Sequence, residues 1–210
     1  MRDCVSSSLP PCVAIPPPSV SGALTALRND MDVFGVAMIA FVTGVGGGTV
    51  RDVLLGSFPV WWVKEPFTIG ICVAGALVAI VGQPVIASRL KALIWADAAG
   101  LGVFAILGAQ AALAAGASPA IAIFMAAVTA TFGGVVRDVL CNEIPLVLRQ
   151  EIYATAALLG AGLYVGLLEL GMAAGLAAVL AALVTFAIRA AAIVFRIQSP
   201  KFGRPRKNEL

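Results

Sequence analysis

Two arginine–aspartate pairs stand where an apolar sequence should carry no charge. Arg51 and Asp52 follow the run GVGGGTV, and Arg137 and Asp138 follow FGGVV, each after an apolar stretch that could begin a membrane crossing. An unpaired charge at bilayer depth costs roughly 2.5–3.5 kcal/mol on insertion scales. These four residues therefore either neutralise one another or belong to the route of an ion.

Catalytic chemistry has little support in the rest of the sequence. The chain has no histidine, which removes the commonest general base, proton relay and metal ligand. Its cysteines show no metal-ligand spacing and are expected to pack as small apolar residues; they are Cys4, Cys12, Cys72 and Cys141. GVGGGT lacks the Lys-Ser/Thr ending of a phosphate-binding loop. We expect no catalytic residue, no metal site and no cofactor.

The composition is that of a membrane protein. Hydrophobic residues make up 60% and charged residues 12% of the 210 positions, against about a quarter charged in soluble domains. The net charge of +3 gives no reason to expect nucleic acid as a partner. Six apolar segments are candidate spans, with membrane lipid as their partner: residues 33–45, 67–85, 92–113, 119–136, 152–170 and 172–195.

The charged pairs belong to an internal repeat. Residues 42–65 align without a gap on residues 128–151, a shift of 86 positions, and 11 of the 24 aligned residues are identical. Each half holds three spans, so the second half must enter the membrane from the opposite side, as in inverted-topology repeats. We predict an all-α polytopic membrane protein with two three-helix repeats and a seventh helix. The expected segments are a Pro-rich start (1–20), the two repeats (21–91 and 92–171), the seventh helix (172–196) and a basic tail (197–210).

The first helix does not fit the repeat. By the 86-residue shift it should cover residues 7–27, but residues 8–20 read SLPPCVAIPPPSV, and proline disrupts a helix interior. Only residues 21–28 have a helical pattern, and residues 19–28 would cover about 15 Å at 1.5 Å per residue. Either the first helix is truncated, or the recorded start differs from the biological one; we favour the second interpretation.

Basic residues set the expected orientation. Seven crossings place Arg2 and Lys64 on one side, next to the interfacial pair Trp61 and Trp62. The other side receives Arg28, Arg89, Lys91, Arg149, Arg196, Lys201, Arg204, Arg206 and Lys207. Nine against two puts the C-terminus in the cytoplasm; the bacterial inner membrane as location is implied by the family resemblance given below.

The glycines before each charged pair predict a broken helix. Clustered glycines let a span unwind, and the freed backbone groups must then face water, an ion or protein. We expect these glycines and the threonines one turn earlier to line a cavity for a cation: Thr43, Gly46, Gly47, Gly48, Thr129, Gly133 and Gly134. The alternative is that the glycines only allow neighbouring helices to approach closely.

Adjacent residues diverge by about 100° on a helix, so an arginine is not expected to pair with the aspartate that follows it. We predict pairing across the repeats instead, Arg51 with Asp138 and Arg137 with Asp52, which would neutralise all four charges. A purely structural clamp is the alternative role of these pairs. Asp97 is expected to pair near the cytoplasmic interface, and Arg189 to extend its head group to the interface.

The residues quoted so far carry a family resemblance. GGGTVRDVLLG, FGGVVRDVLCNEIPLVL and SGALTALRNDMDVFG are similar to the prokaryotic trimeric intracellular cation (TRIC) channels, whose repeated domains are also called glycine transporter domains. The resemblance covers residues 21–195. It implies a homotrimer with a pore for monovalent cations, chiefly potassium, in each protomer. It also implies that the second and fifth of seven helices are kinked, here at Gly46–Gly48 and Gly133–Gly134.

Two functions fit inverted repeats equally well at this point. A channel agrees with the family resemblance, and a secondary transporter of a small solute such as glycine agrees with the repeat architecture. The sequence alone does not separate a channel from a carrier.

Overall fold

The structure, a computed structural model, describes residues 15–82, 89–149 and 152–195, and every regular element in those ranges is a helix. The helices are α2 (Pro16–Arg28), α3 (Val33–Leu55), α4 (Trp61–Lys64), α5 (Phe67–Gly82), α6 (Arg89–Ala114), α7 (Pro119–Leu140), α8 (Leu146–Arg149), α9 (Ala154–Glu169) and α10 (Ala174–Val194). The expectations for residues 1–14, with Cys4 and Cys12, and for the basic tail from Arg196 lie outside the described residues.

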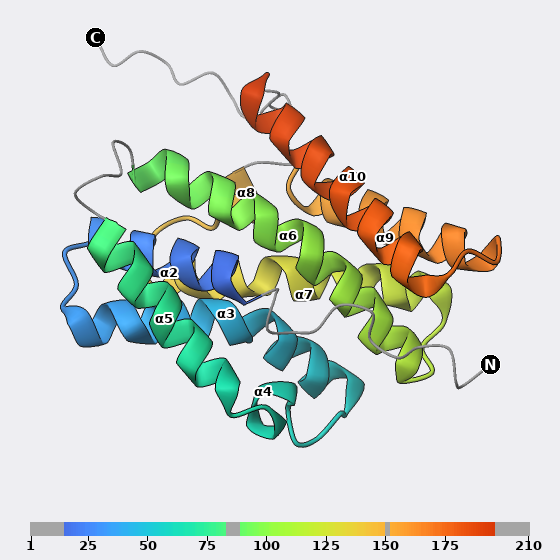
Figure 1. Cartoon of the computed structure of the whole chain (residues 1–210), viewed down its shortest axis with the longest axis horizontal. Coiled ribbons are helices and arrows are strands. Elements are labelled where there is room, and N and C mark those ends of the chain that lie inside the picture. Colours follow the sequence, from blue (N-terminus) through green and yellow to red (C-terminus); the bar gives the residue numbers. More distant parts are fainter. Residues whose placement is uncertain (1–14, 83–88, 150–151, 196–210) are drawn as a thin grey trace, which may run out of the picture.

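The two halves of the chain have the same order of elements. Helices α2, α3 and α5 correspond to α6, α7 and α9, and the short α4 corresponds to α8. In Figure 1, α3 and α7 run in opposite directions, and α4 and α8 lie at opposite ends of the bundle. Helix α10 packs against α6 and α9. The predicted all-α polytopic fold with inverted repeats is confirmed.

Within the described residues, four helical segments are long and apolar enough to cross a membrane: α3, Lys91–Ala114 of α6, α7 and α10. Helices α5 and α9 are also apolar and have 16 residues each in the described ranges. At 1.5 Å per residue, those 16 residues cover about 24 Å.

The prediction for the first helix was wrong at its start. Helix α2 begins at Pro16, with Pro17 and Pro18 also in its first turn, and has 13 residues. Amide groups in a first turn have no acceptor within the helix, so proline loses no hydrogen bond there, and its fixed φ suits the turn. The helix is therefore longer than residues 21–28, and its described residues cover about 20 Å.

Alanine dominates the interior. The largest buried cluster joins α6, α7, α9 and α10, and 10 of its 15 members are alanines. Lipid is as apolar as leucine, so helices in a membrane associate through close contact of small side chains and not through a hydrophobic drive. Large apolar side chains point outward instead, such as Phe34, Phe67 and Leu183, which are more than half exposed.

The N-terminus of α3 allows a matched test of capping. The Asp32 carboxylate accepts a hydrogen bond from the backbone amide of Gly35 at 2.7 Å. At the repeat-related position, Ser118 begins α7 without a side-chain cap. We expect Asp32→Ala to lower the free energy of unfolding by about 1 kcal/mol, and Ser118→Ala to have less effect. Denaturant unfolding in detergent micelles measures both, and equal losses would contradict a specific role for the Asp32 carboxylate.

Candidate functional site

Helices α3 and α7 cross with their backbones in direct contact. A Cβ atom at Gly47 would overlap the carbonyl oxygen of Thr129, and a Cβ atom at Gly133 would overlap the carbonyl oxygen of Thr43. The two contacts are related by the 86-residue shift. Only glycine fits at either position, so the packing role that the sequence left as an alternative is the role these two glycines have.

The predicted unwinding was wrong. Helix α3 runs without interruption from Val33 to Leu55, through Gly46, Gly47 and Gly48, and α7 runs from Pro119 to Leu140 through Gly133 and Gly134. Figure 1 shows that α3 changes direction along its length without losing its helix. A continuous helix keeps its backbone groups hydrogen-bonded, whereas freed groups at this depth would each cost several kcal/mol.

The threonines before the glycines are also part of the packing. Thr43 donates its hydroxyl hydrogen to the carbonyl of Ile39 at 2.6 Å, and Thr129 donates to Met125 at 2.7 Å. Each threonine lies against a glycine of the preceding helix, Gly22 for Thr43 and Gly108 for Thr129. Sequence reasoning did not single out these two glycines, although they are aligned by the repeat and could have been found that way.

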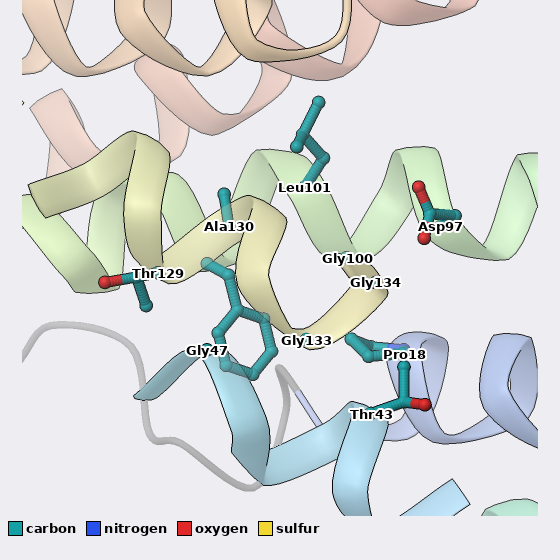
Figure 2. A pocket seen from close by; sticks show the side chains of 11 residues that line it. Pro18, Thr43, Gly47, Asp97, Gly100, Leu101, Thr129, Ala130, Gly133 and Gly134 are labelled. Carbon is teal, nitrogen blue, oxygen red and sulfur yellow. The ribbon is translucent and has the colours of Figure 1, made fainter. Parts of the chain in front are cut away.

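A small cavity lies beside the crossing. Helices α2, α3, α6 and α7 contribute its lining: Pro18, Thr43, Gly47, Asp97, Gly100, Leu101, Phe104, Thr129, Ala130, Gly133 and Gly134. Figure 2 shows these side chains around the crossing, with Asp97 and Leu101 coming from α6. The cavity volume is about 20 Å³, which is room for about one water molecule.

Gly46 and Gly48 are not part of that cavity lining. A Cβ atom at Gly46 would lie 3.5 Å from the Cα atom of Gly133, an ordinary van der Waals distance. Gly48 lies against the indole ring of Trp61. Four of the seven predicted cavity residues (Thr43, Gly47, Thr129 and Gly133) meet at the crossing, and Gly134 completes the cavity wall.

The cross-repeat charge pairs were also predicted wrongly. Arg51 donates through Nε and Nη2 to Oδ1 of Asp52, at 2.8 and 2.7 Å, and Arg137 donates through Nε to Oδ1 of Asp138 at 2.7 Å. Each arginine thus folds back onto its own neighbour. The 100° argument considered only where the side chains leave the helix, and the long arginine side chain spans that divergence.

The crossing explains why the two pairs stay apart. Each arginine lies four residues beyond its glycine, and because α3 and α7 are antiparallel, these four residues lead to opposite ends of the bundle. The pairs are therefore placed one on each side of the crossing, not opposite one another.

Both aspartates also fix the chain that follows their helix. Oδ2 of Asp52 accepts the backbone N–H of Trp61 at 2.7 Å, and Oδ2 of Asp138 accepts that of Leu146 at 2.9 Å. Trp61 and Leu146 begin α4 and α8. Each Arg-Asp motif thus satisfies its own charge and holds the short helix after it, which is the clamp that the sequence left as an alternative.

Asp97 belongs to the second charge group. Its Oδ1 accepts a hydrogen bond from Nη1 of Arg137 at 2.9 Å, and the same guanidinium nitrogen donates to the hydroxyl of Ser21. The other oxygen, Oδ2, is buried without a hydrogen-bond partner. Pairing was predicted for Asp97, but a place in the cavity lining was not. The repeat-related position is residue 11, outside the described residues.

Arg189 does not extend to the interface as predicted. It is 2% exposed, and its guanidinium carbon lies 5.0 Å from the centre of the Tyr153 ring. The aromatic face of a buried tyrosine attracts a cation, which offsets part of the cost of burying it. A separate, larger cavity of about 450 Å³ lies between the end of α6 and the segment from the end of α3 to α4, lined by Asp52, Ser57, Trp61, Lys64, Glu65, Ala111, Ala114 and Ala115. We call this cavity the vestibule.

Two three-helix repeats in opposite orientations, crossed at glycines beside a polar cavity, define a polytopic membrane protein of the inverted-repeat class. The family model described as "Glycine transporter" matches residues 12–84 and 94–169, one match in each half. The chain belongs to this family, and the resemblance to the TRIC channels is confirmed by the solved structures to which it is similar.

Among solved structures, the TRIC trimeric intracellular cation channel orthologue from Rhodobacter sphaeroides is 44% identical, with a TM-score of 0.85 over 89% of this chain and 96% of that one. A prokaryotic TRIC channel solved in 0.5 M KCl is 33% identical, with a TM-score of 0.84 over 89% and 94%. Among curated relatives, the UPF0126 inner membrane protein YadS of Escherichia coli is 38% identical over 88% of this chain and 90% of its own length.

Proposed function

We propose that this protein is a cation channel of the bacterial inner membrane and that each protomer conducts through the cavity at the α3–α7 crossing. The similarity to solved cation channels carries the proposal. The TRIC channel orthologue from Rhodobacter sphaeroides is 44% identical with a TM-score of 0.85. At the α3–α7 crossing this chain has a small cavity whose lining includes the polar side chains of Thr43, Thr129 and Asp97. These observations favour a channel over a carrier of small solutes.

The charge distribution supports a cation as the conducted species. Both arginines next to the route are neutralised by their own aspartates, so neither presents a free positive charge to an ion. Asp97 adds a carboxylate oxygen that has no hydrogen-bond partner and is buried in a residue lining the cavity. An anionic oxygen is a suitable ligand for a monovalent cation, and potassium is the ion we propose.

The expected assembly is a homotrimer with its C-terminus in the cytoplasm. Solved relatives are described as trimeric channels, and this chain has outward positions where a neighbour could approach closely. A Cβ atom at Gly70, Gly162 or Gly166 would meet nothing within 4 Å. The nine basic residues against two set the orientation. Detergent-corrected mass measurement tests the trimer, and a monomer at all concentrations would contradict it.

Recording from purified protein in a planar bilayer tests the channel itself. We expect discrete current steps whose reversal potential follows a potassium gradient. Saturable, coupled uptake of glycine into vesicles, without current steps, would overturn the proposal in favour of a carrier.

A methyl group in the cavity gives the sharper test. A Cβ atom at Gly134 would lie 3.4 Å from the Tyr153 hydroxyl and 3.6 Å from Oδ1 of Asp97, distances that the fold tolerates. Gly134→Ala should therefore fold normally but fill the space for one water. Single-channel conductance should fall about tenfold or more, the effect of a barrier higher by ~1.4 kcal/mol.

Gly46→Ala is the matched control for Gly134→Ala. Its new Cβ atom also makes only an ordinary contact, 3.5 Å from Gly133, and Gly46 does not line the cavity. We expect wild-type conductance for this variant. Equal conductance in both variants would place the conduction route elsewhere.

A further inference from the structure

The vestibule has a repeat-related counterpart at the opposite end of the bundle. Six of the residues that line the vestibule map by 86 positions onto described residues: Asp52 onto Asp138, Ser57 onto Glu143, Trp61 onto Val147, Ala111 onto Thr25, Ala114 onto Arg28 and Ala115 onto Asn29. At three of these positions a short side chain in the vestibule (Ser57, Ala114 and Ala115) corresponds to a longer polar one (Glu143, Arg28 and Asn29).

These three side chains contact one another across the counterpart. Nη1 of Arg28 lies 3.8 Å from Oε1 of Glu143, and Nδ2 of Asn29 donates to the same oxygen at 3.3 Å. Asn29 also donates to the backbone carbonyl of Thr25 at 3.0 Å. The contacts join the end of α2, in one repeat, to the loop after α7, in the other.

We propose that Arg28, Asn29 and Glu143 form a polar plug that closes the cytoplasmic mouth of the conduction route. This proposal rests on the proposed channel function. At the equivalent positions the vestibule has Ala114, Ala115 and Ser57, which are too short to make these contacts. The two ends of the proposed route therefore differ, although they lie at equivalent places in the two repeats.

The plug is weak enough to open. The Arg28 and Glu143 side chains are 31% and 26% exposed. Pairs of this kind contribute at most about 1 kcal/mol, so thermal motion separates them often. Packed apolar side chains would close the route permanently, whereas a partly hydrated ion pair can close it and open again.

A backbone hydrogen bond connects the plug to the cavity. The amide of Glu143 donates to the carbonyl of Asp138 at 2.8 Å. Asp138 binds Arg137, and Arg137 binds Asp97 in the cavity wall. These contacts link the loop after α7 to Asp97, which lines the cavity.

A native thiol lies next to the plug. Cys141 is 6% exposed at the end of α7, and the charges of Glu143 and Arg28 both act on it. Burial raises the pKa of the Cys141 thiol, followed in size by the effect of the Glu143 carboxylate. Its reaction with a membrane-impermeant thiol reagent should accordingly be slow while the plug is closed.

The test replaces the three plug residues with the residues found at the equivalent positions of the vestibule. The variant Arg28→Ala/Asn29→Ala/Glu143→Ser carries the vestibule residues in the plug positions. It is made with Cys4→Ser, Cys12→Ser and Cys72→Ala, so that Cys141 is the remaining cysteine. We expect Cys141 to be labelled about fivefold faster in inside-out vesicles, the factor that corresponds to the loss of about 1 kcal/mol. The open probability in planar bilayers should rise by a similar factor.

Two further variants guard against a simple loss of folding. Arg28→Glu/Glu143→Arg exchanges the charges and should return the open probability to the wild-type value. Ser57→Glu/Ala114→Arg places the charged pair of the plug at the equivalent positions of the vestibule. This variant should reduce the current carried by cations that enter through the vestibule. Labelling and open probability that stay at wild-type values in the triple variant would overturn the plug. Because labelling needs no current, a wild-type protein that conducts nothing would count against the channel function alone.

Discussion

Replacing Gly47 with alanine is expected to lower the free energy of unfolding by about 1–3 kcal/mol or more, the range for an overpacked core. The new methyl group would overlap the carbonyl oxygen of Thr129, which belongs to a helix backbone and cannot rotate away. Helices α3 and α7 would have to separate. Gly133→Ala should cost about the same, because it meets the carbonyl of Thr43 in the equivalent way.

Gly46→Ala is again the control, since it changes the neighbouring residue of the same helix without a close contact. Alanine favours a helix by about 1 kcal/mol over glycine, so this variant should be as stable as the wild type or more stable. Thermal unfolding in detergent, followed by tryptophan fluorescence, compares the three. A stable Gly47→Ala protein would show that the backbones do not touch as described.

The second large effect is expected at Arg137. This side chain is completely buried and is bound by Asp138, Asp97 and Ser21. Arg137→Met leaves two buried carboxylates without their cation, and removing one partner of a buried ion pair costs about 3–5 kcal/mol. Arg51→Met should cost less, because Arg51 makes an ion pair with Asp52 alone among the described residues and both are slightly more exposed.

A double-mutant cycle tests the partner assignment directly. Arg137→Met with Asp97→Asn should show a coupling energy within the range of about 0.5–3 kcal/mol found for residues in contact. Arg51→Met with Asp138→Asn should be additive within about 0.5 kcal/mol, because no ion pair joins them in the described structure. Coupling in the second cycle and not in the first would restore the pairing across the repeats.

The fold was predictable because the sequence contains it twice. Eleven identities in 24 positions at a constant shift of 86 residues imply equivalent structures, and three spans per half imply opposite orientations. The positions at the centre of the site followed from the same alignment. Their role did not, because a glycine that permits unwinding and a glycine that permits close contact look alike in a sequence.

The charge partners could not be read from the repeat. Pairing Arg51 with Asp138 assumed that equivalent residues lie opposite one another, which holds at the crossing and fails one turn beyond it. The partner of Asp97 could not be found in the same way, since residue 11, its repeat-related position, is proline. The start of α2 was missed because three consecutive prolines were weighed as interior residues and not as a first turn.

The paired contacts at the crossing limit how the sequences of the two halves can diverge in evolution. Gly47 meets the backbone of Thr129 as Gly133 meets that of Thr43, which is the reciprocity of an isologous dimer interface within a single chain. Each half therefore carries a surface that fits a second copy of itself inserted upside down. A side chain added in one half collides with backbone in the other, and backbone offers no compensating substitution. Each glycine is thus required by the backbone of the other half, however far the remaining sequences of the repeats diverge.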